Sequence, residues 1–330
     1  MSRTETRLSQ EERHSSFGEG VLASLAPLFR EIVNLKRVRP ARTTPHSLAE
    51  RLFLRSWTAL AKGEGAEAVM RREGAGALVA TRLAGIDAGV MKEHDLPPDR
   101  QRDVLSRAFE VAAAPVEDDL ADRLEDALLE RPGDAPENNE RESDAPAPAR
   151  ALLDQPRAGV TCPGKERLVL APPESHADHC AAVAVMAALL APAAGADPAE
   201  AFFTGLVHHL HNATLPDAGH AGDVLLGDAK DTLTGAARER ALEALPPPLA
   251  GRAEAALAPV DRPPEGERAT PLARAFHAAD ALDRVLEIAW HARTADFTMA
   301  EALGEMNLVH EGPEQAFQQA VLADADVADW

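Results

Sequence analysis

The chain has 330 residues, of which 45% are hydrophobic and only 4% aromatic, with no tyrosine. Alanine and leucine dominate, which favours helices and is poor material for β-sandwiches, so the composition predicts an all-α protein. The formal charge of −20 repels phosphate backbones and makes duplex nucleic acid an unexpected partner. A small phosphorylated ligand held directly by a metal remains compatible with that charge.

The two cysteines, Cys162 and Cys180, are too few for a disulfide framework, and Cys180 lies in an apolar helical pattern typical of a buried free thiol. The segment from Ser2 to Gly20 is polar, without the apolar core of a signal peptide, and no stretch approaches the length of a membrane span. These observations predict a protein of the reducing cytoplasm that does not contact a membrane.

The N-terminal part is predicted to be a flexible tail, residues 1–17, followed by a helical unit, residues 18–130. Apolar residues recur at helical intervals in this unit, and prolines and glycines mark the ends of the segments. The expected helices cover residues 17–38, 46–63, 66–91 as one or two helices, 98–109 and 116–129.

Residues 131–150 are rich in Pro, Asp, Glu, Asn and Ala and contain no large apolar residue. Such a segment buries too little hydrophobic area to offset the entropy of ordering, so a disordered linker and a domain boundary are predicted there. The second unit, residues 151–330, is also expected to be helical, with a brief strand at 168–171 and a loop at 212–227. Its expected helices cover residues 176–190, 198–208, 230–245, 247–258, 271–294 and 298–322.

Nine of the twelve histidines fall between His176 and His310, and three short stretches there place imidazole or carboxylate at helical spacing beside apolar runs. Folding can bring together the side chains of four residues: His179, His208, His209 and Asp280. Neutral imidazole and ionised carboxylate hold divalent first-row metals and leave a position for water, which becomes a nucleophile when bound. The sequence therefore predicts a divalent metal site, with Mn, Co, Ni, Zn and Fe as candidate ions.

The order of these groups resembles the HD-domain metal-dependent phosphohydrolase superfamily, in particular its branch of bacterial 5′-deoxynucleotidases, whose first motif reads Glu-Ser-x-Ala-Glu-His. In this chain the motif stands as Glu174-Ser-His-Ala-Asp-His179, and the resemblance covers roughly residues 165–300. It implies an HD-like helical bundle in the C-terminal half, a phosphate ester as substrate with a small nucleotide favoured, and four metal ligands, which by position are His179, His208, His209 and Asp280.

Two positions depart from the family's pattern. His209 replaces the aspartate of the His-Asp dyad, which exchanges an anionic ligand for a neutral one. Asn212 stands where the family has a glutamate, and an amide cannot accept a proton. Asp217 matches a later aspartate of the family, so Asp217 or His211 is expected to move protons. His211 and His220 also offer ligands for a second metal.

The N-terminal unit contains a similar stretch, His46-Ser-Leu-Ala-Glu-Arg51, which can be laid over Glu174–His179 with Ser, Ala and an acid in step. This match suggests an HD-like repeat that has lost its metal site, because Arg51 takes the position of His179. Chance similarity between helices explains six residues equally well.

Single histidines on alanine-rich helices are usually packed side chains, and that interpretation is favoured for those taken one at a time: His176, His277, His291 and His310. Residues expected beside the metal, or as alternative ligands, are His176, Asn212, His220 and His277.

The leading hypothesis is a metal-dependent phosphohydrolase acting on a small phosphate ester. One alternative is a catalytically silent HD-like module that binds metal, ligand or a partner protein, and Asn212 and His209 favour it. A third is an iron-dependent oxygenase of the HD type, which would hold two iron atoms per chain. Self-association of the chain is a further expectation that the sequence leaves open.

Overall fold

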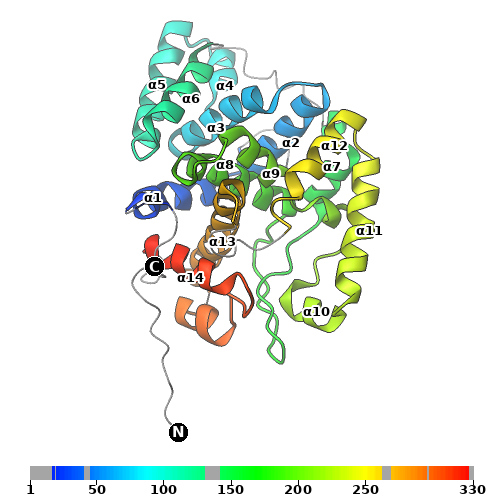
Figure 1. Ribbon diagram of the computed structural model, residues 1–330. Helices are drawn as coiled ribbons and strands as arrows, with labels where there is room; N and C mark the ends of the chain where they lie inside the picture. Colours follow the sequence, from blue (N-terminus) through cyan, green and yellow to red (C-terminus); the bar gives the residue numbers. More distant parts are fainter. Residues whose placement is uncertain are drawn as a thin grey trace.

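The computed structural model describes residues 17–18, 20–40, 45–130, 142–261, 269–295 and 297–326. Over these residues the protein is all-α, as predicted, and none of them forms a named strand (Figure 1). Two isolated antiparallel bridges occur, one joining Pro156 to Ser175 and one joining Val160 to Leu168. The brief strand expected at 168–171 is therefore reduced to a single bridge.

Six helices make up the N-terminal unit, and all of them fall where the hydrophobic periodicity predicts. They are α1 (Val21–Asn34), α2 (Leu48–Ala61), α3 (Ala66–Leu83), α4 (Ala88–Glu93), α5 (Pro98–Ala113) and α6 (Asp118–Glu130). Helix α2 begins with a capping box in which Ser47 and Glu50 each bond the other's backbone N–H. Residues 1–16 of the predicted flexible tail lie outside the described part, whereas Phe17 is buried.

The C-terminal unit holds the remaining elements. They are η2 (Glu142–Asp144), α7 (Ala147–Asp154), α8 (His176–Ala194), α9 (Pro198–Val207), η3 (Leu210–Ala213), α10 (Gly219–Leu226), α11 (Ala229–Glu243), α12 (Pro247–Leu257), α13 (Pro271–Ala292), the π-helical turn η5 (Glu301–Glu305) and α14 (Gln315–Asp324).

The structure corrects the predicted linker and one predicted loop. Residues 131–141 lie outside the described part, but residues 142–150 form η2 and the first turn of α7. Disorder is wrong for that stretch because Ala145 and Ala149 are buried against the rest of the protein, which offsets the cost of ordering. The segment 212–227 contains α10, which ends at Gly227, so it is more than a loop.

Two predicted helix ends also need correction. Helix α8 continues through Pro192 to Ala194, because a proline in the last turn removes only one backbone hydrogen bond, and Gly195 then ends the helix in a left-handed conformation. The single helix expected at 298–322 is two elements, η5 and α14, separated by a turn in which Asn307 has a positive φ of 47°.

Helix α8 is the centre of the fold, with α9 and α13 packed along it and with α1, α2 and α7 also in contact (Figure 1). The expectation that no stretch approaches the length of a membrane span is wrong for α8, which is long and apolar enough by length and composition, although 89% of that window is buried inside the protein. Helix α9 approaches it closely at Gly205, where an added Cβ would come within 2.4 Å of the Ala184 Cα. Burial on every side explains why α8 has no polar face.

The beginnings of α2 and α8 contact each other reciprocally. Ser47, the N-cap of α2, donates from its hydroxyl to the Asp178 carboxylate, and Ser175, the N-cap of α8, donates to Glu50 Oε1 at 2.9 Å. Each serine also accepts from the backbone N–H three residues further along its own helix. The cap residue of each helix therefore donates a hydrogen bond to a carboxylate at the start of the other helix, and these two contacts join the two units.

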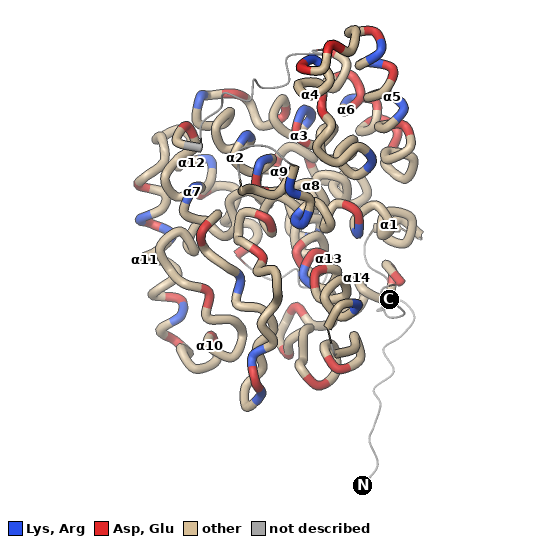
Figure 2. The backbone as a smooth tube through the Cα atoms, turned by 180° about the vertical axis from the view of Figure 1, so that it is seen from behind, with Lys and Arg blue, Asp and Glu red and all other residues tan. Residues whose placement is uncertain are grey.

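Acidic and basic positions are interspersed over the helices in Figure 2. No long track of basic residues runs along the described helices in that view.

Candidate metal centre

His179 lies in the first turn of α8 and is fully buried. Its Nδ1 donates to Asp283 Oδ2 at 2.6 Å, and Asp283 comes from the middle of α13. This hydrogen bond assigns the proton to Nδ1, so the lone pair of Nε2 points to the opposite side of the ring. There Nε2 lies 3.2 Å from Asp280 Oδ1.

His208 follows the last residue of α9, and its Nδ1 donates to the Gly205 carbonyl at 2.8 Å. A carbonyl at the end of a helix has no partner within the helix, so this bond satisfies both groups. The lone pair of His208 then lies on Nε2, which is 3.1 Å from His179 Nε2 and 3.9 Å from Asp280 Oδ1. Two imidazole lone pairs thus face one another beside a carboxylate.

The four predicted ligands, His179, His208, His209 and Asp280, each offer one ligand atom within 4.8 Å of all the others. Ligands bound tetrahedrally at roughly 2.0–2.2 Å from a metal are separated by about 3.3–3.6 Å from one another. The distances of 3.1, 3.2 and 3.9 Å among the His179, His208 and Asp280 atoms lie within about 0.3 Å of that range, so small shifts of the side chains would fit a metal. The predicted convergence is confirmed for the described structure.

His209 differs from the other two imidazoles. Its Nδ1 donates to Asn212 Oδ1 at 2.7 Å, and its Nε2 accepts from Arg157 Nη1 at 2.7 Å. Its one lone pair is therefore already used. A metal bound by His209 must displace the Arg157 guanidinium, whereas His179, His208 and Asp280 need no such change.

Burial lowers the pKa of His208 and of His209 well below the usual value, and neighbouring imidazoles add to the effect. Burial also opposes the charge of Asp280, but its hydrogen bond to His179 and the nearby Arg284 hold the pKa of this carboxyl well below its usual range. Neutral imidazole and ionised carboxylate are the protonation states that metal ligands require. His208, His209 and Asp280 are in these states before any ion is bound. Burial opposes the charge of His179, but its hydrogen bonds with Asp280 and Asp283 raise the pKa of this imidazole, so a bound metal must displace a proton from Nε2.

The other predicted residues surround this centre in different ways. Asp217 accepts the backbone N–H groups of Ala158 and Gly219, both at 2.9 Å, so its carboxylate holds two loop segments together. The His211 ring lies 5.5 Å from the His209 ring, and its buried Nδ1 has no hydrogen-bond partner in the described structure. The roles of Asp217 and His211 in proton transfer stay predictions.

His176 donates from Nδ1 to the Gln155 carbonyl, and its ring lies 4.8 Å from that of His209. Asn212 orients His209, as described above. His220 stacks on His310 with 3.7 Å between ring centroids, and the His277 ring packs against Phe276. Of these four residues, Asn212 and His176 contact the predicted ligand His209, whereas His220 and His277 pack against other rings.

Three residues beside the centre were missed by the sequence reasoning: Lys36, Arg157 and Asp283. Asp283 bonds His179, and the adjacent Arg284 pairs with Asp280. Helical spacing gave a usable signal, since Asp283 lies one turn after Asp280 on the same face. Lys36 and Arg157 are far away in the sequence and carried no comparable signal.

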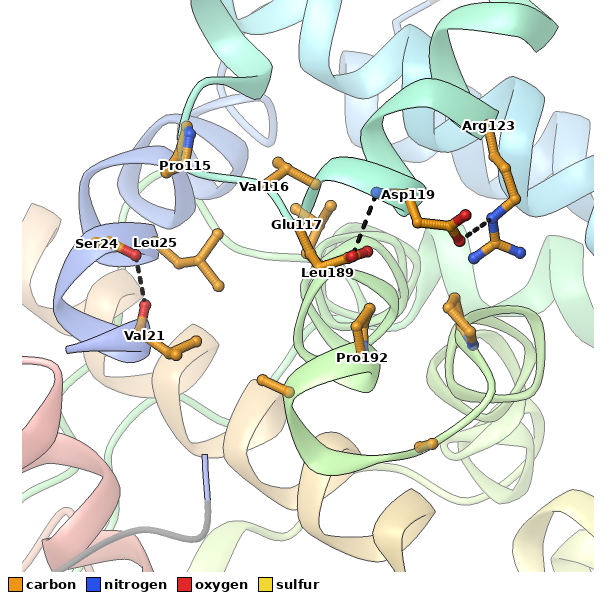
Figure 3. A pocket seen from close by; sticks show the side chains of 13 residues that line it. Val21, Ser24, Leu25, Pro115, Val116, Glu117, Asp119, Arg123, Leu189 and Pro192 are labelled. Atoms are coloured by element: carbon orange, nitrogen blue, oxygen red, sulfur yellow. Dashed lines mark hydrogen bonds and ion pairs between the residues drawn. The ribbon is translucent and has the colours of Figure 1, made fainter. Parts of the chain in front are cut away.

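Two pockets accompany the fold. One, of about 50 Å³, is lined by Arg157, Thr161, Glu174, His220, Arg284, Glu287 and His310 among others, and so adjoins the centre. Another, of about 520 Å³, lies between α1, the start of α6 and the C-terminal end of α8 (Figure 3). Leu189 and Pro192 line this pocket, so it lies at the opposite end of α8 from His179, and its acids Glu117 and Asp119 would repel phosphate.

Comparison with known proteins gives no match to a family model, to a curated protein or to a solved structure. The geometry of the centre therefore carries the functional argument.

Proposed function

We propose that the chain binds a divalent metal ion through His179, His208 and Asp280, with His209 at the fourth position, and hydrolyses a small phosphate ester there. The observation that carries this proposal is the convergence of two imidazole Nε2 atoms and a carboxylate oxygen at 3.1, 3.2 and 3.9 Å. A divalent ion held by these residues supplies Lewis-acid activation of water and of a phosphoryl oxygen near neutral pH.

Positive charge beside the ligands supports an anionic substrate. Arg157 bonds His209, and Arg284 Nη2 donates to Asp280 Oδ2 at 3.2 Å. Both arginines line the 50 Å³ pocket, where planar guanidinium groups can bind phosphate oxygens in pairs. Together with the resemblance to HD-domain enzymes, these contacts favour a small nucleotide in the reducing cytoplasm as the substrate.

The rival proposal is a silent module that binds metal or ligand without turnover. The chain of bonds from Arg157 through His209 to Asn212 favours it, because this chain uses the His209 lone pair and leaves no carboxylate at position 212. An oxygenase with two iron atoms has less support. The second cluster of possible ligands, Glu174, His179 and Asp283, already holds the Lys36 ammonium.

Elemental analysis of the purified protein, followed by a phosphatase screen with Mn, Co, Ni, Zn and Mg added in turn, tests the proposal. About one metal per chain and hydrolysis of a nucleoside monophosphate are expected. The His179→Ala variant is the matched control and should lose both. A wild-type protein that binds metal but hydrolyses no ester with any ion would favour the silent module, and two irons per chain would favour the oxygenase.

The two departures from the family pattern give a sharper test. Replacing His209 by Asp gives Arg157 an anionic partner and adds a charged ligand, and Asn212→Glu adds a proton acceptor one turn away. General acid–base assistance is worth about 10²- to 10⁴-fold in rate, so the double variant should raise activity by a measurable part of that range. Unchanged activity, together with loss of turnover in His211→Ala or Asp217→Asn, would assign proton transfer to the native residue instead.

A further inference from the structure

A buried amine from the N-terminal unit lies directly behind the metal centre. Lys36, which follows the end of α1, places Nζ 2.5 Å from Glu174 Oε1, 2.7 Å from Asp283 Oδ1 and 3.4 Å from Glu287 Oε2. Its side chain is 2% exposed and that of Asp283 is 0% exposed. Three carboxylates from two other elements thus surround one ammonium group out of contact with water.

These charges depend on one another. Burial opposes the charge on Lys36, but attraction to Asp283, Glu174 and Glu287 exceeds that cost, and the pKa of the amine is raised. Glu287 is also paired with Arg37 Nη2 at 2.5 Å, so it has a second cation. No other lysine or arginine pairs with Asp283 in the described structure, and its Oδ2 accepts hydrogen bonds from Lys36 Nζ at 2.8 Å and from His179 Nδ1 at 2.6 Å. Loss of the ammonium would therefore affect Asp283 most.

The bond from Asp283 to His179 sets which nitrogen of His179 is free. While this carboxylate stays in place, neutral His179 keeps its proton on Nδ1, and the Nε2 lone pair faces Asp280 and His208. An Asp283 carboxylate that turns away from the ring no longer favours that tautomer. The ring would then present an N–H to the metal position, and metal binding would have to displace it.

We propose that Lys36 is a positioning residue of the metal centre. Its ammonium lies between Glu174 and Asp283, holds the Asp283 carboxylate in place against His179 Nδ1, and so keeps the Nε2 lone pair of neutral His179 directed at the metal position. The N-terminal unit is by this account a functional part of the site. The inference rests on the proposed metal binding but not on the proposed hydrolysis.

The test uses the full chain with Lys36→Met, which keeps much of the side-chain length and removes the charge. Because this variant leaves unbalanced acids in the core and can fail to fold, a second variant, Lys36→Met with Glu287→Gln, keeps the net charge of the cluster constant. The matched control is Arg55→Met, since Arg55 pairs with the buried Glu73 between α2 and α3 but does not contact the centre.

Two readouts separate a positioning role from a merely structural one. The first is the dissociation constant for Co²⁺ and Zn²⁺, from competition with a chelating dye. The second is the tautomer of His179 in metal-free protein, from long-range ¹⁵N–¹H correlation spectra. Loss of an outer partner of a metal-bound histidine usually costs about 10- to 100-fold in affinity, and that loss is expected in both Lys36 variants with a shift away from the Nδ1–H form. Arg55→Met should change neither.

Folded Lys36 variants with wild-type affinity and an unchanged His179 tautomer would overturn the proposal. If the wild-type protein binds no metal, the proposed function fails, and the tautomer measurement still decides whether Lys36 sets His179. If metal binds but no ester is hydrolysed, the role of Lys36 stands and only the hydrolase is lost.

Discussion

The starts of α2 and α8 share the same local construction and differ in one decisive side chain. Each begins with a serine cap, Ser47 or Ser175. Each also carries an acid three residues later, whose carboxylate accepts a hydrogen bond from the serine hydroxyl of the other helix. At the next position α2 has Arg51 and α8 has His179. The capping hydrogen bonds stabilise both helix starts, and the following residue decides which of them carries a candidate metal ligand.

The surroundings of the two starts reinforce that difference. His179 is met by His208 and Asp280 on one side and by Asp283 on the other. The counterpart helix α3, which follows α2 as α9 follows α8, ends at Leu83 without a histidine pair. Divergence of an ancestral repeat would produce two similar helix starts of which only one has the candidate ligands. The repeat itself stays a prediction. A metal site needs side chains from several elements at once, so one half of the chain can lose its metal site through a few substitutions and still keep its fold.

The largest loss of metal binding is expected from substitution of His179, the residue that distinguishes the start of α8 from that of α2. His179→Ala removes the ligand that contacts both Asp280 and His208, and metal binding should fall below detection in the dye competition assay. Arg51→Ala, the same change at the matching position of α2, should leave the metal affinity within a factor of about three. Equal losses in the two variants would mean that His179 acts through folding rather than as a ligand.

A second pair of variants compares the packing in the two halves. Gly205→Ala places a Cβ 2.4 Å from the Ala184 backbone, so α8 and α9 must separate, at a cost of about 1–3 kcal/mol. Because Gly205 also accepts from His208, metal affinity should fall as well.

Gly74→Ala in α3 is the control. Its Cβ would meet only the flexible Leu124 side chain at 3.2 Å, and alanine gains up to about 1 kcal/mol of helix propensity. Urea denaturation should therefore show a large loss for Gly205→Ala and a change near zero for Gly74→Ala. A tolerated Gly205→Ala would contradict the close approach of α8 and α9.

The reciprocal caps predict matched losses. Ser47→Ala and Ser175→Ala each remove one helix cap and one hydrogen bond to the opposite unit, and caps are worth about 0.5–2 kcal/mol. Both variants should lose a similar amount in denaturant unfolding, with Ser175→Ala alone also weakening metal binding because it lies at the start of α8. A loss in only one of them would show that the two contacts are not equivalent.

A further expected effect is one of pH. Burial, with nearby positive charge from Arg157, Arg238 and Arg284 respectively, lowers the pKa of His176 to about 3 and those of His211 and His310 to about 4. Such residues are neutral in the folded chain, whereas the unfolded chain takes up protons below about pH 6.5.

Their contribution to stability is therefore fully present above pH 6.5 and is lost as the pH falls toward 4. All three histidines lie in the C-terminal unit, so its backbone amides in α9 and η3 should exchange faster at pH 5 than at pH 7, once corrected for intrinsic rates. Amides in α3 and α5 should change less. The reverse order would contradict the assignment of neutral, buried histidines.

Much of the fold followed from the sequence because its signals are local. Apolar residues at helical spacing, with Ser47, Ser175 or Asp197 as caps, place helices whatever surrounds them. The same logic failed between 142 and 150, where composition argued for disorder and only packing of Ala145 and Ala149 against other elements supplied the missing burial.

The candidate ligand set was also predictable from the sequence, because few other roles bring together histidines at helix ends, as at His179, His208 and His209, with an aspartate inside an alanine-rich helix, as at Asp280. What the sequence could not determine is which lone pairs are free. His209 is engaged by Arg157, and His179 depends on Asp283 and, behind it, on Lys36 from the other unit. Hydrogen bonds and ion pairs act over about 3 Å regardless of separation along the chain, so only the packing of α1 and the segment before α8 against α13 could decide them.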